Sequence, residues 1–245
     1  MNDIETRRKQ ILETVISEYI DHALPVSSEF LKNECSLDIS PATIRMDLVE
    51  LTRDGFLQKT HISSGRVPTD KGYRFFVDTL FDTNIDFVIS KIIKEFNEVF
   101  DDFVDVSELS HQLATDLAET SHNLSMVCFG DTGAVYKEGW EEVMKAVEFN
   151  DTKYLRRFID FVGDFEKKLK TIDFKKGEKI KIFIGKESPF RKKEFSVIVG
   201  SPETKNKEQK PKFAILGPKR MNFKKNISLI NSLIETVENF NHGTN

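Results

Sequence analysis

The sequence has few of the residues that form disulfides, metal sites or membrane spans. Its 245 residues include only Cys35 and Cys128 and no CxxC pair, which argues against a disulfide framework and a zinc knuckle. No apolar run approaches the roughly 18 residues of a membrane span, and the polar start is unlike a secretory signal. No two of its five histidines have metal-ligand spacing, and no GxSxG occurs. We therefore expect a cytoplasmic protein that has no membrane contact, no catalytic residues and no cofactor.

Charge is distributed unevenly along the chain. The formal net charge of −4 does not indicate a nucleic-acid binder, and 39% hydrophobic residues suffice for a packed core. Residues 79–165 hold 7 basic and 18 acidic residues, whereas residues 166–225 hold 19 and 7. The second stretch is compatible with nucleic-acid binding. Its lysines are scattered and have no interleaved aromatic residues, so the pattern favours a solvated face balanced by the acidic segment.

Three short helices are predicted at the start of the chain. Apolar spacing over residues 4–22 predicts the first, and Ser27-Ser28 offers a cap for a short second helix. Ser40-Pro41 combines an N-cap with proline at the first helical position, and Gly55 suits the end of that third helix.

A β-ribbon follows the third helix. Residues 56–62 and 66–67 are predicted to pair around the turn Ser63-Ser64-Gly65, and Thr69 can cap a fourth helix. Three helices followed by a ribbon is the order of a winged helix-turn-helix, in which the third helix enters the major groove.

Residues 85–121 are predicted to be helical, as one helix or two. Apolar residues at alternating steps of four and three form a heptad seam, which is typical of a dimer interface. The predicted interface residues are Ile85, Ile89, Ile92, Phe96, Val99, Phe103 and Val106. The alternative is that this stripe packs on its own domain.

The remaining sequence alternates strands and helices. Strands are predicted at 124–129, 134–136, 180–184, 195–199 and 213–216, with helices capped by Asp151 and Asn222. The chain is thus expected to be α+β, with a winged helix over 1–80, a helical linker and dimerisation segment over 81–121, and an α+β domain over 122–245.

Several motifs in order resemble the heat-inducible transcription repressor HrcA family. The match includes RKQIL at 8–12, SPATIR at 40–45, SSGRVPTDKGYR at 63–74 and LGPKRM at 216–221. The resemblance implies a homodimeric repressor of chaperone operons that binds an inverted-repeat operator, CIRCE, on double-stranded DNA. It also implies a GAF-like C-terminal domain and promotion of the active fold by the GroEL chaperonin.

The chain departs from the family pattern in two places. Met46 stands where the family usually has Asn, which leaves one DNA contact in doubt. The material between the strand pair at 124–136 and Glu148-Phe149 is short, so the family's inserted dimerisation subdomain is expected to be missing.

The candidate DNA-binding residues lie on the third helix, the ribbon and the fourth helix. Arg45 is expected to pair with guanine, or else with a neighbour or a phosphate, and Ser40 to cap its helix first and contact phosphate second. The ribbon is expected to lie in a narrow groove, or to be an ordinary polar hairpin. The full set is Ser40, Thr43, Arg45, Met46, Asp47, Arg53, Lys59, His61, Ser63, Ser64, Gly65, Arg66, Lys71 and Arg74.

Two other function classes compete with a DNA-binding repressor. One is a ligand- or chaperone-sensing module that uses the winged helix for protein contacts, and the other is an enzyme. The enzyme hypothesis finds no support, because the sequence has no recognisable group of acid, base or nucleophile residues. At Gly217-Pro218-Lys219-Arg220 a structural turn is favoured over an anion site.

Overall fold

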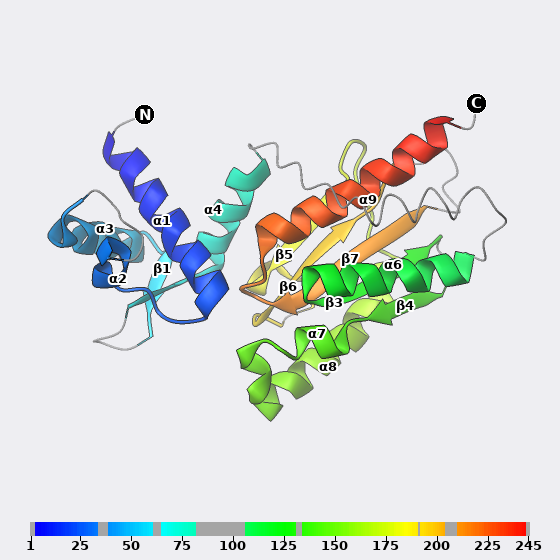
Figure 1. The fold of residues 1–245 in the computed structure, drawn as a ribbon, viewed down its shortest axis with the longest axis horizontal. Coiled ribbons are helices and arrows are strands. Elements are labelled where there is room, and N and C mark those ends of the chain that lie inside the picture. Colours follow the sequence, from blue (N-terminus) through cyan, green and yellow to red (C-terminus); the bar gives the residue numbers. More distant parts are fainter. Residues whose placement is uncertain are drawn as a thin grey trace. The chain divides into compact units, whose positions relative to one another are not determined.

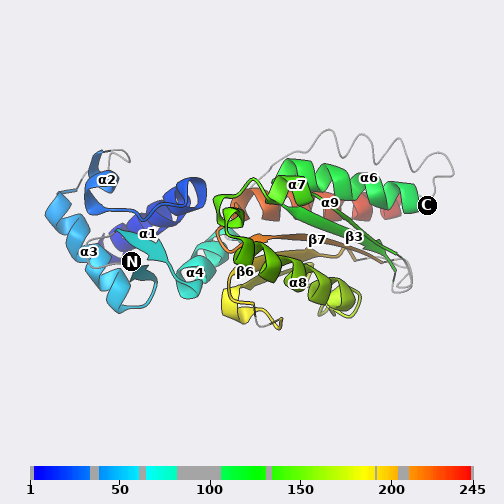
Figure 2. The ribbon, with the colours of Figure 1, turned by 90° about the horizontal axis from the view of Figure 1, so that it is seen from below.

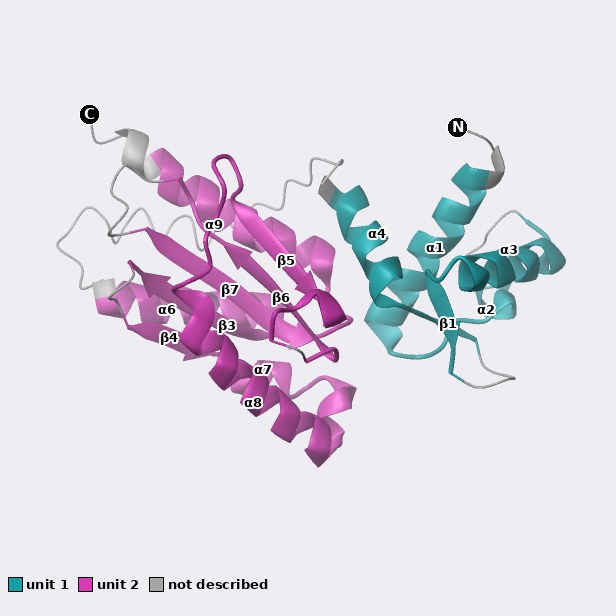
Figure 3. Cartoon of the chain, turned by 180° about the vertical axis from the view of Figure 1, so that it is seen from behind, with its two compact units in different colours: residues 1–84 teal, residues 85–245 magenta. Residues whose placement is uncertain are grey.

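The computed structural model describes residues 3–33, 39–60, 65–81, 106–130, 134–190, 192–203 and 210–243. Contacts along the chain divide it into two compact units, residues 1–84 and 85–245 (Figure 3).

Unit 1 consists of three helices, a two-stranded antiparallel sheet and a fourth helix (Figure 1). Its elements are α1 (Asp3–His22), α2 (Ser28–Asn33), α3 (Pro41–Arg53), β1 (Leu57–Lys59), β2 (Arg66–Pro68) and α4 (Asp70–Phe81). This is the element order expected from the sequence. The apolar face of α1 is buried, as its spacing predicts, through Ile11, Leu12, Val15, Ile16 and Ile20.

The ends of these helices follow their capping residues. Ser40 has extended backbone and its side chain accepts a hydrogen bond from the Thr43 amide, with proline next in the chain. Gly55 has φ of 79°, a left-handed conformation that glycine adopts without strain, directly after the end of α3. The Thr69 hydroxyl accepts from the Gly72 amide at the start of α4. The capping predictions for these helices are therefore confirmed.

Unit 2 is a five-stranded sheet with helices on both faces (Figure 2). Its strands are β3 (Leu124–Phe129), β4 (Val135–Glu138), β5 (Ile180–Ile184), β6 (Phe195–Gly200) and β7 (Pro211–Pro218). Their order is β4-β3-β7-β6-β5, and all four neighbouring pairs are antiparallel. The helical elements are α6 (Val106–Ser121), α7 (Trp140–Val143), η1 (Val147–Asn150), α8 (Thr152–Leu169), η2 (Gly185–Glu187) and α9 (Phe223–Gly243).

The two faces of the sheet have different partners. α6 and α9 lie on one face and α8 on the other (Figure 2). A Cβ added to Gly200 of β6 would overlap Ile230, which places α9 directly over that strand. The α8 face is packed with aromatic rings, where Phe158 contacts Phe195 at 5.1 Å and Trp140 at 6.0 Å between ring centroids. Much of the phenylalanine in the sequence therefore fills this core.

The expected helical linker is described only in part. Residues 82–105 lie outside the described residues, and with them the seam residues Ile85, Ile89, Ile92, Phe96, Val99 and Phe103. Val106 is the first residue of α6, which packs against β3 and β4. Leu113 and Leu117, which continue the same spacing, are buried in unit 2. This end of the stripe therefore serves its own domain.

Candidate nucleic-acid interface

The start of α3 is fixed by two hydroxyl groups. Ser40 Oγ accepts a hydrogen bond from the Thr43 amide at 3.1 Å and lies 2.8 Å from Thr43 Oγ1. Both residues are thus engaged in the first turn of the helix. Their predicted contact with DNA adds a second role to this structural one.

The inner face of α3 holds one charged residue that was expected on the outer face. Ile44, Leu48 and Leu51 are buried as expected, but Asp47 is also buried, at 2% exposure. The expectation that Asp47 faces a duplex is therefore wrong. Its position is four residues before Leu51 and three after Ile44, which is the same side of a helix.

Two arginines of α1 hold the Asp47 carboxylate in this position. Arg7 donates to it through Nε at 2.7 Å and through Nη2 at 3.1 Å, and Arg8 Nε donates at 3.1 Å. Burial raises the pKa of Asp47, but the bonds from Arg7 and Arg8 outweigh it, so the pKa lies below its usual value. The same bond raises the pKa of Arg7. The network ties α1 to α3, and the two guanidinium groups balance the negative charge of this carboxylate.

The outer face of α3 is basic and apolar. Arg45 is exposed, and its side chain makes no ion pair or hydrogen bond with any described residue. Met46 is 70% exposed and Val49 is 50% exposed. Arg53, also exposed, pairs with Glu50 at the end of the helix. Arg45 is therefore the α3 cation best placed to meet an external ligand.

The hairpin of β1 and β2 lies beside this helix in unit 1. Lys59 is exposed and sits opposite Arg66 in the antiparallel register. A Cβ on Gly65 would overlap the carbonyl of Val26, so glycine at this position allows the close approach of the segment before α2. The predicted tip residues His61, Ser63 and Ser64 lie outside the described residues.

Arg66 was expected to be an exposed groove contact, and this expectation is wrong. It is buried, at 8% exposure, and its Nε donates to Thr52 Oγ1 at 2.9 Å. Its backbone exchanges hydrogen bonds with Val26 at 2.9 and 2.7 Å. Burial also lowers the pKa of the guanidinium. Arg66 therefore joins the hairpin to α3 and to the segment before α2.

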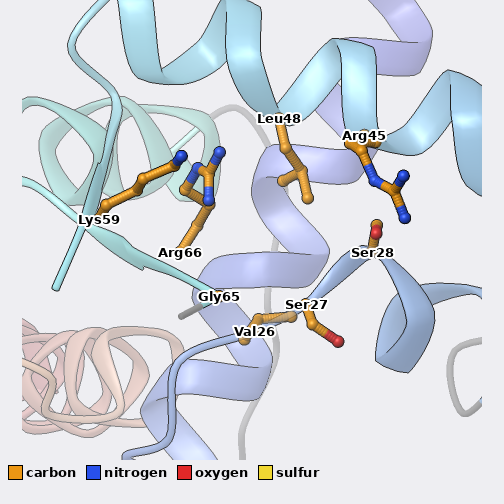
Figure 4. Close-up of a pocket in the computed structure, with 8 residues that line it drawn as sticks. All are labelled: Val26, Ser27, Ser28, Arg45, Leu48, Lys59, Gly65 and Arg66. Carbon is orange, nitrogen blue, oxygen red and sulfur yellow. The ribbon is translucent and has the colours of Figure 1, made fainter. Parts of the chain in front are cut away.

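A cavity of about 240 Å³ opens where these elements meet (Figure 4). Arg45 reaches from α3 towards Ser28, while Lys59 and Arg66 extend from the hairpin (Figure 4). The lining residues are Val26, Ser27, Ser28, Arg45, Leu48, Lys59, Gly65 and Arg66. Three cations and two hydroxyls around one hollow favour an anionic ligand such as a phosphodiester.

The role of the segment before α2 in this cavity was not expected from the sequence. Ser27 Oγ caps α2 by accepting a hydrogen bond from the Phe30 amide at 3.0 Å, as predicted. That Ser27 and Arg45 line the same cavity was not predicted. The tight approach at Gly65 is the feature that brings the segment there.

Two further predicted phosphate contacts serve partly to stabilise unit 1. Lys71 Nζ donates to the Asp54 carbonyl at 2.8 Å and lies 4.2 Å above the centre of the Phe56 ring. Arg74 pairs with Asp78 at 3.5 Å, one turn later in α4. Both remain predictions as DNA contacts.

The described part of the chain has no membrane-spanning helix and no cluster of metal ligands. Its helices are too short or too polar to cross a membrane, and its His, Cys, Asp and Glu side chains do not gather in groups of three as a metal ion requires. Arg220, in the turn considered for an anion, binds Glu148 through Nε at 2.6 Å and Nη2 at 3.0 Å.

The matching family model and the curated relatives belong to one family. The family model described as HrcA protein C terminal domain matches residues 49–227. A heat-inducible transcription repressor HrcA of Natranaerobius thermophilus is 36% identical over 137 residues, which cover 56% of this chain and 39% of that protein. The one of Roseiflexus castenholzii is 32% identical over 173 residues, covering 70% of this chain and 46% of that protein.

The fold also has a solved counterpart. A crystal structure of a hypothetical protein at 2.2 Å resolution matches over the full length of both chains, with a TM-score of 0.77 and 16% identity, which concerns the fold alone. The chain spans less than half of the length of the two curated relatives from Natranaerobius and Roseiflexus. Since the family model covers most of the sequence, from within α3 to the first turns of α9, the chain belongs to the HrcA family.

Proposed function

We propose that this chain is a DNA-binding transcription repressor of heat-shock chaperone operons. Unit 1 acts as a winged helix-turn-helix in which α3 enters the major groove and the β1–β2 hairpin follows the backbone. The observation that carries the proposal is the outer face of α3, where exposed Arg45 borders a cavity that Lys59 and Arg66 also line. The names of the curated relatives, heat-inducible transcription repressors, support the heat-shock role.

The charge arrangement of α3 suits a polyanion. A carboxylate on the docking face would repel phosphates, but Asp47 is turned inward and held by Arg7 and Arg8. Glu50 is bound by Arg53 and lies 3.8 Å from Arg8. The outer surface therefore presents cations without a free carboxylate of α3 beside them.

The assembly and its regulation are proposed from the family resemblance. The chain binds an inverted-repeat operator of the CIRCE type as a homodimer, with one α3 in the major groove of each half-site. Unit 2 is a GAF-like domain, and the GroEL chaperonin promotes its active fold. The sheet of unit 2, with helices on both faces, is compatible with this proposal.

The test is a salt-dependent binding titration on three labelled duplexes: the inverted repeat, a single half-site and a scrambled repeat. We expect the inverted repeat to bind most tightly, and all three affinities to fall as salt increases. Equal affinity for the repeat and the scrambled duplex would contradict an operator-specific repressor. Absence of duplex binding, together with capture of the chain by chaperonin, would instead favour the protein-contact module.

A further inference from the structure

The exposed stripe of α3 is apolar at the positions where a surface helix is usually polar. Ala42, Met46 and Val49 follow each other at steps of four and three, and all three are exposed. The exposed fractions of Met46 and Val49, 70% and 50%, are high for side chains of this size. The opposite face meanwhile buries a charged residue, Asp47. The polarity of the helix is thus partly inverted, which core packing does not explain.

The surroundings of this stripe indicate what covers it. Arg45 precedes Met46 in the sequence and lines the cationic cavity, and Arg53 ends the same helix. An apolar protein partner would have to bury the Arg45 guanidinium with the stripe, at a cost in desolvation. A DNA major groove offers apolar groups and phosphates together, so its chemistry matches both parts of the surface.

We infer that Met46 and Val49 are specificity-determining residues that contact the C5-methyl groups of thymines in the major groove. This inference rests on the proposed function, in which α3 enters that groove. Thymine is the base that presents a methyl group there, and apolar side chains read it by contact. Residues three apart are neighbours on a helix surface, so the two side chains face the same groove and can contact different base pairs.

The test removes the methyl groups and leaves all base-pair hydrogen bonds in place. An inverted-repeat duplex with A·T pairs in each half is compared with the same duplex carrying deoxyuridine for every thymidine. We expect the unaltered chain to lose about fourfold in affinity for each contacted methyl group, from the transfer free energy of one such group. The double variant Met46→Ala with Val49→Ala is expected to bind both duplexes equally.

Two control variants separate methyl contact from a general loss of binding. Met46→Leu keeps an apolar side chain and should retain the preference for thymine. Met144→Ala makes the same substitution at a 41% exposed methionine of unit 2 and should also retain it. Circular dichroism of each variant reports whether the helices remain folded.

Each remaining outcome overturns the inference in a distinct way. If the unaltered chain binds both duplexes equally, the proposed function stands and the methyl contact is wrong. If the double variant keeps the full preference for thymine, the methyl groups are read by other residues. If the thymine duplex itself is not bound, the inference fails together with the proposed function.

Discussion

Arg45 and Lys59 line the same cavity but belong to elements for which we propose different roles on a duplex. Arg45→Ala should lose about 1–3 kcal/mol of binding free energy on the inverted repeat and little on scrambled DNA, because a guanidinium on α3 can read guanine. Lys59→Ala should weaken both duplexes similarly and reduce the slope of log affinity against log salt by about 1. Paired salt titrations measure both quantities.

Equal losses on both duplexes for Arg45→Ala would make it a phosphate contact. Arg66 is a poor choice for this comparison. Its buried side chain bonds to Thr52, so its removal would lower the stability of unit 1 as well as any affinity.

Asp47 gives unit 1 a stability that depends on pH. The folded pKa lies below the unfolded value of about 3.9, so the stabilisation is present above that value and disappears as pH falls through the folded pKa. Asp47→Asn should lower the free energy of unfolding by about 1–3 kcal/mol at pH 7, because Arg7 and Arg8 lose a charged acceptor. Urea unfolding at several pH values measures this effect.

Asp78→Asn is the matched control for this pH series. Asp78 is 62% exposed and pairs only with Arg74 among the ion pairs of the described residues, so its substitution should change stability by less than about 0.5 kcal/mol. A gap between Asp47→Asn and the unaltered chain that stays constant down to pH 3 would contradict the ion-pair account.

At the scale of elements, two glycines differ in what a side chain would meet: Gly65 lies against the backbone of Val26, whereas Gly163 faces open space. Gly65→Ala should displace the segment at Val26 from the hairpin and destabilise unit 1 by more than about 1 kcal/mol. Gly163 lies within α8, where an added methyl group would meet open space, so Gly163→Ala should stabilise unit 2 by up to about 1 kcal/mol. Thermal unfolding of both variants tests the pair, and a stabilising Gly65→Ala would refute the close-approach argument.

Local signals in the sequence predicted most helix starts. Ser40, Thr69 and Asp151 each cap a helix where expected, because a cap depends on residues within one turn. Strand limits depend on distant partners, and only some were predicted: β3 and β5 have the expected limits, whereas β7 does not. β7 extends over Pro211–Pro218 instead of residues 213–216, since β3 and β6 pair with it on both sides.

The sequence predicted the position of a site side chain only where that side chain has no distant partner. Arg45 and Met46 are exposed as the helical pattern of α3 indicates. Helix spacing puts Asp47 on the side of Ile44 and Leu51, but a carboxylate can be buried there only because Arg7 and Arg8, about forty residues earlier, bind it. Arg66 likewise turns inward because Thr52 accepts its hydrogen bond. Charged residues are placed by their partners, which only the fold brings together.

For the whole molecule, we propose that the oligomeric state depends on the heptad seam that the sequence predicts at residues 85–106. This seam is predicted to form much of the dimer interface, and burial of a phenylalanine contributes roughly 1.5–3 kcal/mol. Phe96→Asp combined with Phe103→Asp should therefore give a folded monomer that binds the inverted repeat weakly. Light scattering measures the mass and circular dichroism the fold. A double variant that stays dimeric, or unfolds, would assign these residues to a domain core.

The aromatic core of unit 2 also makes the two units separately observable. The chain has one tryptophan, Trp140, and it packs edge-on against Phe158 within unit 2. Intrinsic tryptophan emission should therefore follow the unfolding of unit 2, while far-ultraviolet dichroism follows the helices of both units. A heat-induced change in dichroism that precedes the shift in emission would identify unit 1 as the part of the chain that responds first to temperature.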